Sequence, residues 1–539
     1  MEESKEFFNV GIDSIGFYTT NHYVDLQELA EVRDVDPNKY LKGLLTKEMR
    51  IPATGEDILS LAVKAGQYTL MKGKIDPKEI DAVFLGTETM TFAVKSVSNI
   101  ICELLGTSPN CVTQDVYNAC AGETLAVLNA IGLINNGIIK KALIIGADIC
   151  SYKLKSPGEP TQGAAAAAVI ISKNPRIAVF GKHFGKYSAN INDFYRLPNE
   201  KYPVVFGKYS VESYIQFQLA AFNDFYNNAG MILPDYMVFH SPFAKLPLKN
   251  VQNLLLKRWD ILKKILLEKS VEKNESITIQ SEAIEYLDDL LKPVLEKIKK
   301  EDNLTEIEQL KQELTQSLKY RVLPALNVPM TIGNMYSASI WAQLVYMLES
   351  VVASDNLIYF GSYGSGATCI SGMLKVIPGF EKIVERGPTV NNFFQYKKRR
   401  TISDYEAQRK EISQRDTFYA RIEPHPSNEN YFIDMNICDE SCVNSRADGL
   451  GFCPSGFKRP NRKKLPMYAI IKTDPTQQID EKDYLDMNIV RVSKDAKKNQ
   501  VVEYNLLRAG EHETAPCIKS GFINWIPTYK PVIYPIDIK

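Results

Sequence analysis

Residues 81–88, Asp-Ala-Val-Phe-Leu-Gly-Thr-Glu, form a short apolar run that ends abruptly in polar residues. Such a run predicts a buried strand. Three further runs of this kind are 141–145 (KALII), 165–171 (AAAAVII) and 236–239 (YMVF). Between these runs, residues 58–70 and 125–134 have the apolar spacing of a helix. Strands that alternate with helices predict an α/β fold, in which helices cover a central sheet.

The composition is that of a globular protein. The chain has 539 residues, of which 64 are basic and 64 acidic, 45% are hydrophobic and 24% are charged. Zero net charge excludes a chain-wide attraction to nucleic acid. The sequence contains no apolar stretch of the roughly 18 residues that indicate a membrane span, and its start, MEESKE, lacks a signal-peptide pattern. Nine thinly spread cysteines, an odd number, favour a reducing, cytoplasmic compartment.

The character of the chain changes three times after residue 249. In 250–320, apolar residues step by three and four with Lys and Glu between them, which predicts a helical insertion that packs on the body or on a partner chain. A membrane-surface role is the alternative. The α/β pattern returns at 321, where the run 357–360 (LIYF) leads directly into GSYGSG at 361–366. Beyond about 430 we expect a small β-rich appendage of unknown role.

Cys120 stands immediately before the predicted helix at 125–134. A thiol at a helix N-terminus lies at the positive end of the helix dipole, so we expect a lowered pKa and a nucleophilic thiolate. An inert buried cysteine is the alternative, which the sequence leaves open.

Glu88 and His240 directly follow two of the predicted strands. In α/β folds, chemistry gathers where strands end and helices begin. Burial would raise the pKa of the Glu88 carboxyl, which suits a general acid or base. A helix-capping Glu88 and a hydrogen-bonded core His240 are the alternatives. Together with Cys120, the two residues form a set suited to acyl transfer.

Seven ordered segments resemble the 3-hydroxy-3-methylglutaryl-CoA synthase family, whose members are condensing enzymes with a thiolase fold. These segments are 10–15 (VGIDSI), 35–40 (VDPNKY), 118–120 (NAC), 158–163 (GEPTQG), 201–205 (KYPVV), 239–245 (FHSPFAK) and 362–366 (SYGSG). The resemblance covers about 10–245 and 320–425. It implies a thiolase-like fold of two fused α/β halves. The expected organisation is therefore an N-terminal half at 1–249 with the nucleophile Cys120, the helical insertion at 250–320, a C-terminal half at 321–429 and the β-rich appendage at 430–539.

The resemblance also implies a reaction. Acetyl-CoA and acetoacetyl-CoA would condense to 3-hydroxy-3-methylglutaryl-CoA through an acetyl thioester on Cys120, as in the mevalonate pathway of isoprenoid biosynthesis. Glu88 would be the general acid/base, and His240 would position and polarise the acetoacetyl carbonyl. Other residues match positions that bind the substrate, namely Asn334, Ser365, Tyr363, Gly364, Thr161 and, near the CoA phosphates, Lys245. The family implies a homodimer and requires neither a metal nor a redox cofactor.

Four residues depart from the family pattern. Ala121 replaces a Tyr after the nucleophile, Phe206 and Phe92 each replace an Asp, and Glu123 stands where Gly or Ala is usual. A carboxylate at Glu123 would raise the pKa of the Cys120 thiol.

Two basic clusters, 397–400 and 458–464, could contact CoA phosphates or the acidic face of a carrier protein, although most such runs are solvated surface. The spacing of Cys438, Cys442 and Cys453 argues against a zinc site.

Two other functions stay open at this point. One is a β-branching synthase that acts on polyketide intermediates bound to an acyl carrier protein. The other is a degenerate thiolase-fold scaffold whose additions bind partners.

Overall fold

The computed structural model describes residues 6–412, apart from 53–55, 93, 198–199, 271–274, 276, 303–305 and 396. Beyond 412 it describes five short strands, namely β16 (Glu423–Pro424), β17 (Tyr431–Phe432), β18 (Tyr468–Ala469), β19 (Val490–Val492) and β20 (Tyr504–Asn505). The rest of the expected appendage lies outside the described residues, and so do the basic cluster at 458–464 and Cys438, Cys442 and Cys453.

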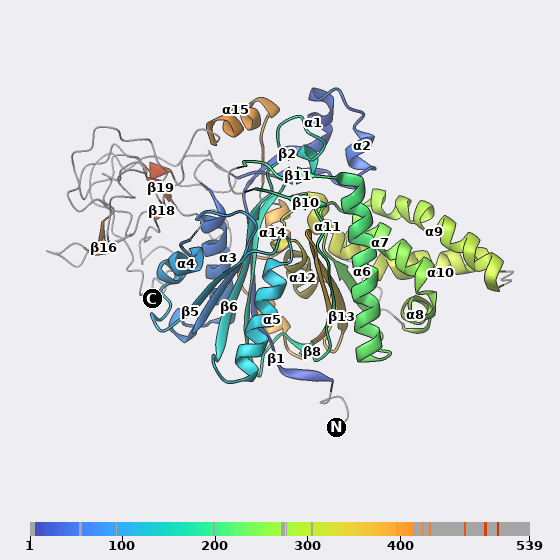
Figure 1. Ribbon diagram of the computed structural model, residues 1–539, viewed down its shortest axis with the longest axis horizontal. Helices are drawn as coiled ribbons and strands as arrows, with labels where there is room; N and C mark the ends of the chain where they lie inside the picture. The colour runs from blue at the N-terminus through green and yellow to red at the C-terminus, as the bar shows by residue number, and fades with distance from the viewer. Residues whose placement is uncertain are drawn as a thin grey trace.

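A mixed ten-stranded sheet forms the centre of the molecule (Figure 1), with the order β12-β13-β14-β8-β1-β7-β6-β4-β5 and β9 paired to β14. Its strands are β1 (Phe7–Thr19), β4 (Ala82–Gly86), β5 (Val112–Val116), β6 (Lys141–Ile149), β7 (Ala164–Lys173), β8 (Ala178–Gly181), β9 (Gly185–Ser188), β12 (Tyr236–Phe239), β13 (Leu357–Gly364) and β14 (Thr368–Val376). β4 pairs in parallel with β5 and β6, and β12 pairs in parallel with β13. The predicted strands coincide with β4, β6, β7 and β12, so the α/β fold class is confirmed.

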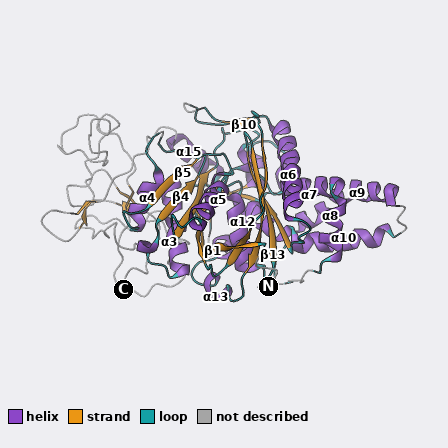
Figure 2. Ribbon diagram, turned by 60° about the horizontal axis from the view of Figure 1, so that its bottom comes forward, coloured by secondary structure: helices purple, strands orange, loops and turns teal. Residues whose placement is uncertain are grey.

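Helices cover the sheet in layers (Figure 2). α3 (Ile58–Gly73) and α4 (Val97–Leu105) pack on one side of the N-terminal strands, and α5 (Gly122–Asn135) and α12 (Ala338–Ser350) lie on the other side. α6 (Gly207–Ala229) covers the C-terminal strands. The interior strands β6 and β7 are almost wholly buried, because they have helices on both faces.

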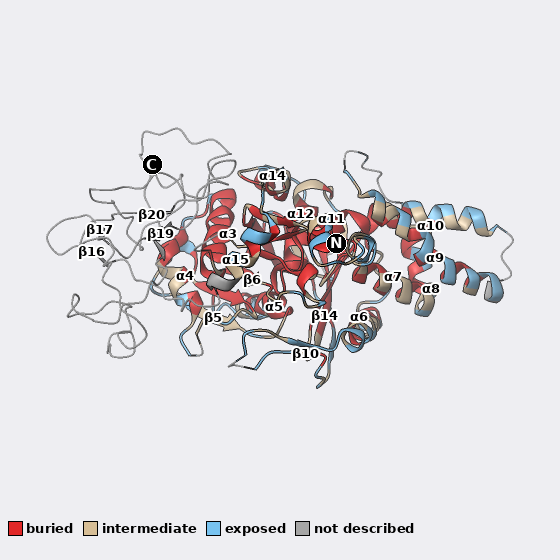
Figure 3. Cartoon of the chain, turned by 90° about the horizontal axis from the view of Figure 1, so that it is seen from above, coloured by how far each residue is buried: buried red, intermediate tan, exposed pale blue. Residues whose placement is uncertain are grey.

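The remaining helices lie around this body. They are α1 (Leu26–Val32), α2 (Asn38–Leu41), α7 (Lys245–Lys257), α8 (Trp259–Lys263), α9 (Ser281–Asp302), α10 (Ile307–Arg321), α11 (Leu323–Ile332), α13 (Glu381–Val384), α14 (Val390–Gln395) and α15 (Ile402–Ile412), with short turns at Pro77–Glu79, Glu159–Thr161 and Lys264–Glu268. α9 and α10 project from the body as an arm whose outer faces are exposed (Figure 3). No helix in the described ranges is both long and apolar enough to cross a membrane.

Two small sheets flank the central one. β10 (Phe194–Tyr195) pairs with β11 (Val204–Val205), and β15 (Lys398–Arg399) adds to β2 (His22–Asp25) and β3 (Glu48–Arg50). The basic cluster at 397–400 lies on this second sheet. There Lys397 pairs with Glu48, Arg399 with Glu28 and Arg400 with Asp404, so the cluster serves intramolecular ion pairs.

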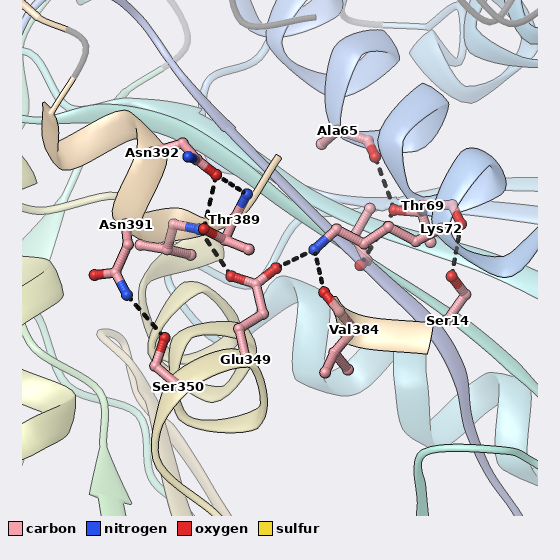
Figure 4. Close-up of polar contacts among 12 residues, drawn as sticks. Ser14, Ala65, Thr69, Lys72, Glu349, Ser350, Val384, Thr389, Asn391 and Asn392 are labelled. Atoms are coloured by element: carbon pink, nitrogen blue, oxygen red, sulfur yellow. Dashed lines mark hydrogen bonds and ion pairs between the residues drawn. The ribbon is translucent and has the colours of Figure 1, made fainter. Parts of the chain in front are cut away.

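A buried ion pair joins the two halves of the chain (Figure 4). Lys72 of α3 contacts Glu349 of α12, and both side chains are fully buried. Lys72 Nζ also donates to the Val384 carbonyl at 3.0 Å, and Glu349 Oε2 accepts from the Val390 N–H at 2.7 Å. The pair therefore connects α3 with α12, α13 and α14, three helices that follow α3 much later in the sequence.

Candidate active site

The Cys120 loop connects β5 to α5. Ala119 has a φ of 42°, a left-handed conformation that is uncommon outside glycine and that turns the chain sharply before Cys120. The turn is held by hydrogen bonds from the Ala121 N–H to the Asn118 carbonyl at 3.0 Å and from Ser337 Oγ to the Ala119 carbonyl at 3.0 Å. Cys120 thus precedes the first turn of α5, as predicted, and is 7% exposed.

Gly364, at the end of β13, lies directly against this loop. A Cβ at residue 364 would stand 2.5 Å from the Asn118 carbonyl oxygen and 2.8 Å from the Ala121 nitrogen. Only a glycine leaves room for this approach. The sequence resemblance assigned Gly364 to substrate binding, and the structure places it as support for the nucleophile loop.

Cys120 and Glu88 are in direct contact, because the Cys120 thiol donates a hydrogen bond to Glu88 Oε1 at an Sγ–O distance of 3.1 Å. Burial and the neighbouring charge of Asp148 raise the pKa of Glu88 to about 8. A carboxyl group with this pKa can both accept and return a proton near neutral pH.

The expected lowering of the Cys120 pKa is wrong. Burial and the facing Glu88 carboxyl raise the pKa of the thiol well above its ordinary value. Desolvation and a nearby negative charge both disfavour the thiolate, and here they outweigh the helix dipole. A thiolate therefore forms as the thiol proton moves to Glu88.

Asp148 organises the Glu88 segment, a role that the sequence analysis missed. Asp148 lies near the carboxyl end of β6 and is fully buried. Its carboxylate accepts from the Glu88 N–H at 2.9 Å, from the Ser337 N–H at 2.9 Å and from the hydroxyls of Thr87 and Thr89, each at 2.8 Å. The available signal was its position after a predicted strand, which Glu88 and His240 share.

His240 lies in the same cavity as Cys120 and is fully buried. Its backbone is fixed by the Gly361 carbonyl at 2.9 Å and by the Tyr214 hydroxyl at 2.7 Å. Neither ring nitrogen has a hydrogen-bond partner among the described residues. Burial lowers the pKa of His240 to about 3, so the imidazole is neutral and can offer one donor and one acceptor to a ligand.

Two adjoining cavities surround these groups. Cys120 and His240 line a cavity of about 510 Å³, and Glu88 lines a neighbouring one of about 390 Å³. The predicted substrate-binding residues that line the larger cavity are Asn334, Ser365, Tyr363 and Thr161. The two cavities have four residues in common, namely Phe194, Pro203, Tyr336 and Ser365. The space is large enough for an acyl group and the thiol end of its carrier.

Lys245 is not part of this lining. Its Nζ donates to the Lys42 carbonyl at 3.0 Å and lies 4.1 Å from the centre of the Tyr286 ring. Its backbone N–H donates to the carbonyl of Leu44, which does line the larger cavity. The ammonium group therefore lies beside the cavity wall and is occupied by intramolecular contacts.

The four residues that depart from the family pattern lie in different environments. Glu123 is fully buried with its carboxyl group against Gly146, and burial raises its own pKa well above the ordinary value. The raised Cys120 pKa comes from burial, Glu88, Asp148 and Cys150, and Glu123 is not among these causes, so its expected effect on the thiol is not borne out. Phe92 is half-buried against the main core.

Phe206 and Ala121 each stand at the start of a helix. Phe206 is 52% exposed before α6, and its N–H donates to the Asp193 carbonyl at 2.9 Å. The Asp193 side chain supplies a buried carboxylate nearby, which accepts from the Tyr363 hydroxyl at 3.1 Å and the Gly366 N–H at 3.0 Å. Ala121 is buried at the start of α5.

Within the described ranges, no group of three or more His, Cys, Asp or Glu side chains is arranged to bind a metal ion. What the site does contain is a thiol paired with a carboxyl group and, in the cavity that the thiol lines, a neutral imidazole. A nucleophile paired with an acid/base is the arrangement that acyl transfer requires.

Comparison with known proteins gives one consistent result. The family description "Hydroxymethylglutaryl-coenzyme A synthase N terminal" matches residues 7–176, and its C-terminal counterpart matches residues 178–435. A hydroxymethylglutaryl-CoA synthase of Gibberella zeae is 32% identical over 385 residues, which cover 66% of this chain and 80% of the relative. The Enterococcus faecalis enzyme of the same name is 28% identical, with 74% of this chain and 91% of the relative covered.

Solved structures show the same likeness. A structure described as MvaS in complex with 3-hydroxy-3-methylglutaryl coenzyme A has a TM-score of 0.62 and 26% identity, and the match covers 74% of this chain and 91% of that one. The Curacin biosynthetic pathway HMG synthase has a TM-score of 0.60 and 23% identity over 75% of this chain and 89% of that one. The expected thiolase-like fold is thereby confirmed.

Proposed function

Because this chain belongs to the hydroxymethylglutaryl-CoA synthase family, we propose that it condenses acetyl-CoA with acetoacetyl-CoA to give 3-hydroxy-3-methylglutaryl-CoA. The observation that carries the proposal is the contact between the Cys120 thiol and the Glu88 carboxyl at 3.1 Å, beside a cavity that Cys120 and His240 line. CoA thioesters are the substrates, and the reaction needs no cofactor.

The first step is acetyl transfer to Cys120. The thiol passes its proton to Glu88 as its sulfur attacks the thioester carbonyl of acetyl-CoA, and the carbon–sulfur bond to CoA breaks. Free CoA leaves with one proton, and Cys120 keeps the acetyl group. Splitting the condensation at a covalent intermediate replaces one difficult step by two easier ones.

The second step is condensation. Glu88 as carboxylate removes a methyl proton from acetyl-Cys120, and the enolate attacks the C3 carbonyl of acetoacetyl-CoA. The neutral His240 donates a hydrogen bond to that carbonyl oxygen and so stabilises the developing alkoxide. Glu88 returns its proton to the alkoxide, and water then releases the product from Cys120.

Labelled acetyl-CoA tests the acetylation step. We expect one acetyl group on Cys120, found by mass spectrometry, and its transfer into product when acetoacetyl-CoA is added. Acetylation from an acetyl-carrier protein but not from acetyl-CoA would favour the β-branching alternative. If neither acetyl-CoA nor the acetyl-carrier protein labels Cys120, the scaffold alternative would be favoured and both enzymatic functions would be refuted.

We further propose that the protein works as a homodimer in the cytoplasm and supplies the mevalonate pathway. β5 is an open edge of the central sheet, with Val112 on the strand 46% exposed and Tyr117 directly after it 41% exposed, which suits pairing with a second copy. Light scattering would detect the dimer. Expression in a cell that lacks its own synthase and depends on added mevalonate should restore growth, and the Cys120→Ala variant should not.

A further inference from the structure

A second pair of cysteines lies at the edge of the sheet, apart from the catalytic cavity. Cys102 belongs to the last turn of α4, and Cys111 directly precedes β5. Their sulfur atoms are 3.8 Å apart, with the Cys102 thiol donating toward Cys111. Both residues are half-buried and carry free thiols. The contact brings together two thiols that are separated by a short turn.

The surrounding structure holds this pair in register. Asp115 of β5 accepts from the Val97 N–H at 2.6 Å and the Ser98 N–H at 2.9 Å, which fixes the start of α4 against the strand. Gly106, with a φ of 75°, ends α4 and reverses the chain toward β5. Because α4 is anchored at its other end, the two thiols stay opposite each other. A disulfide bond, about 2.0 Å long, is within reach of small side-chain rotations.

The two thiols are electronically unequal. The hydrogen bond from Cys102 stabilises a thiolate on Cys111 and lowers the pKa of Cys111, whereas the same contact and burial raise the pKa of Cys102. The thiolate is the form of cysteine that reacts with oxidants. Cys111, which accepts the hydrogen bond in this contact, is the sulfur better suited to attack, and Cys102 is the one suited to resolve.

From this geometry we propose that Cys102 and Cys111 form a reversible oxidation site that responds to peroxide. The Cys111 thiolate attacks a peroxide oxygen, so Cys111 becomes a sulfenic acid and the peroxide is reduced. The Cys102 thiol then attacks that sulfur, a disulfide forms and water leaves. Two thiols and one hydrogen peroxide thus give one disulfide and two waters, and a dithiol reductant reverses the change.

The disulfide would act on the part of the fold that carries the nucleophile. β5 leads within four residues to Cys120, and the loop before α4 carries Glu88. The disulfide would link α4 covalently to β5, at the opposite end of the helix from the contacts with Asp115. We therefore expect the oxidised protein to unfold at a higher temperature than the reduced one.

The test uses the full chain with Cys120→Ser, so that oxidation of the nucleophile does not interfere. Protease that cuts after glutamate separates the two thiols, because Glu103 lies between them, and gives peptides 89–103 and 104–123 with one cysteine each. After treatment with hydrogen peroxide, we expect these peptides joined and lighter by two hydrogens. Dithiothreitol should separate them again.

The matched variant is Cys111→Ser in the same background. It should give no joined peptide and no rise in melting temperature on oxidation. The proposal is overturned if peroxide carries Cys111 to sulfinic acid without joining the peptides. Pairing of Cys111 with a cysteine other than Cys102 would overturn it as well, and this result does not depend on how the variant folds.

Discussion

Cys120 Sγ and Glu88 Oε1 lie 3.1 Å apart, and the carboxyl group is the only partner that the thiol contacts by a hydrogen bond among the described residues. Since the pKa of Glu88 is about 8, the carboxylate needed to accept the thiol proton is scarce at low pH. Acetylation of Cys120 should therefore rise about tenfold per pH unit below 8 and level off above it. Rapid-quench measurement of acetyl-enzyme across this range checks the profile.

The control is Glu88→Gln. This variant should lower the rate of Cys120 acetylation at least ~100-fold, and its pH profile should lose the break, that is, the change of slope near pH 8. A break at or below pH 6 in the unmodified enzyme would contradict the assignment.

Asp148 should set the position of that break. Its charge is the second cause, after burial, of the raised Glu88 pKa. In Asp148→Asn the break should move to lower pH, because the repulsion that disfavours the Glu88 carboxylate is gone. Thr89→Val removes one hydroxyl donor from Asp148 and keeps the charge, so its break should stay near pH 8. Equal shifts in both variants would indicate a structural effect only.

His240 should contribute to condensation and not to acetylation. Its imidazole is neutral, with a pKa of about 3, so no ionisation of His240 should appear between about pH 5 and 8 in either step. His240→Ala should leave acetyl-Cys120 formation within about threefold and slow product formation at least ~100-fold. Single-turnover kinetics separate the steps, and equal losses in both would refute the division.

The effects on stability of substitutions at Glu123 and Gly146 should not be additive. A Cβ at residue 146 would lie 1.8 Å from Glu123 Oε2, so Gly146→Ala should lower the free energy of unfolding by about 1–3 kcal/mol. In a Glu123→Ala background the same change should cost clearly less, because the carboxyl group is absent and only the Ala338 Cα, 3.0 Å from the added Cβ, stays close. Urea unfolding measures both.

Gly132→Ala is the matched control in α5. A Cβ there meets no atom within 4 Å, so stability should stay equal or rise by up to ~1 kcal/mol. A Gly146→Ala cost that is the same in both backgrounds would mean that Glu123 does not fill this space.

Removing one partner of the buried Lys72–Glu349 ion pair should lower the free energy of unfolding far more than removing one partner of an exposed ion pair. Lys72→Met leaves an unpaired carboxylate in the core and should lower the free energy of unfolding by about 3–5 kcal/mol. The loss should grow as pH rises, because the folded state of the variant must keep Glu349 protonated. Adding Glu349→Gln removes the charge, keeps an acceptor for the Val390 N–H and should recover much of the loss.

The exposed Lys208–Glu212 pair supplies the comparison. Lys208→Met should change stability by less than ~0.5 kcal/mol. Comparable losses for both lysines would contradict the role of burial.

Much of the fold followed from local sequence patterns. β12 spans the predicted residues 236–239, and α3 begins at the predicted Ile58, because continuous apolar runs and helical spacing are properties of neighbouring residues. The end of a predicted strand led to Glu88, and the start of a predicted helix led to Cys120. The two residues lie close together because β4 and β5 pair in parallel and their carboxyl ends meet.

The rest depends on contacts between distant segments. Asp148 accepts from Ser337, which is 189 residues away, and no local pattern reports such a partner. The pKa of Cys120 depended on which of two opposed effects was larger, and burial is visible only in the folded chain. Lys245 shows the same limit, since its position beside the motif did not reveal that its ammonium group contacts Lys42 and Tyr286.

The close approach of Gly364 to Asn118 and Ala121 has an evolutionary and practical consequence. The nucleophile sits in the N-terminal half, but the surface that shapes its loop is a strand of the other half. We therefore expect neither half alone to be a catalyst, so that gene fragments encoding one half would carry the sequence motifs without reactivity. Acylation of Cys120 in a fragment that ends before residue 357 should return only when the complementary fragment is supplied in trans.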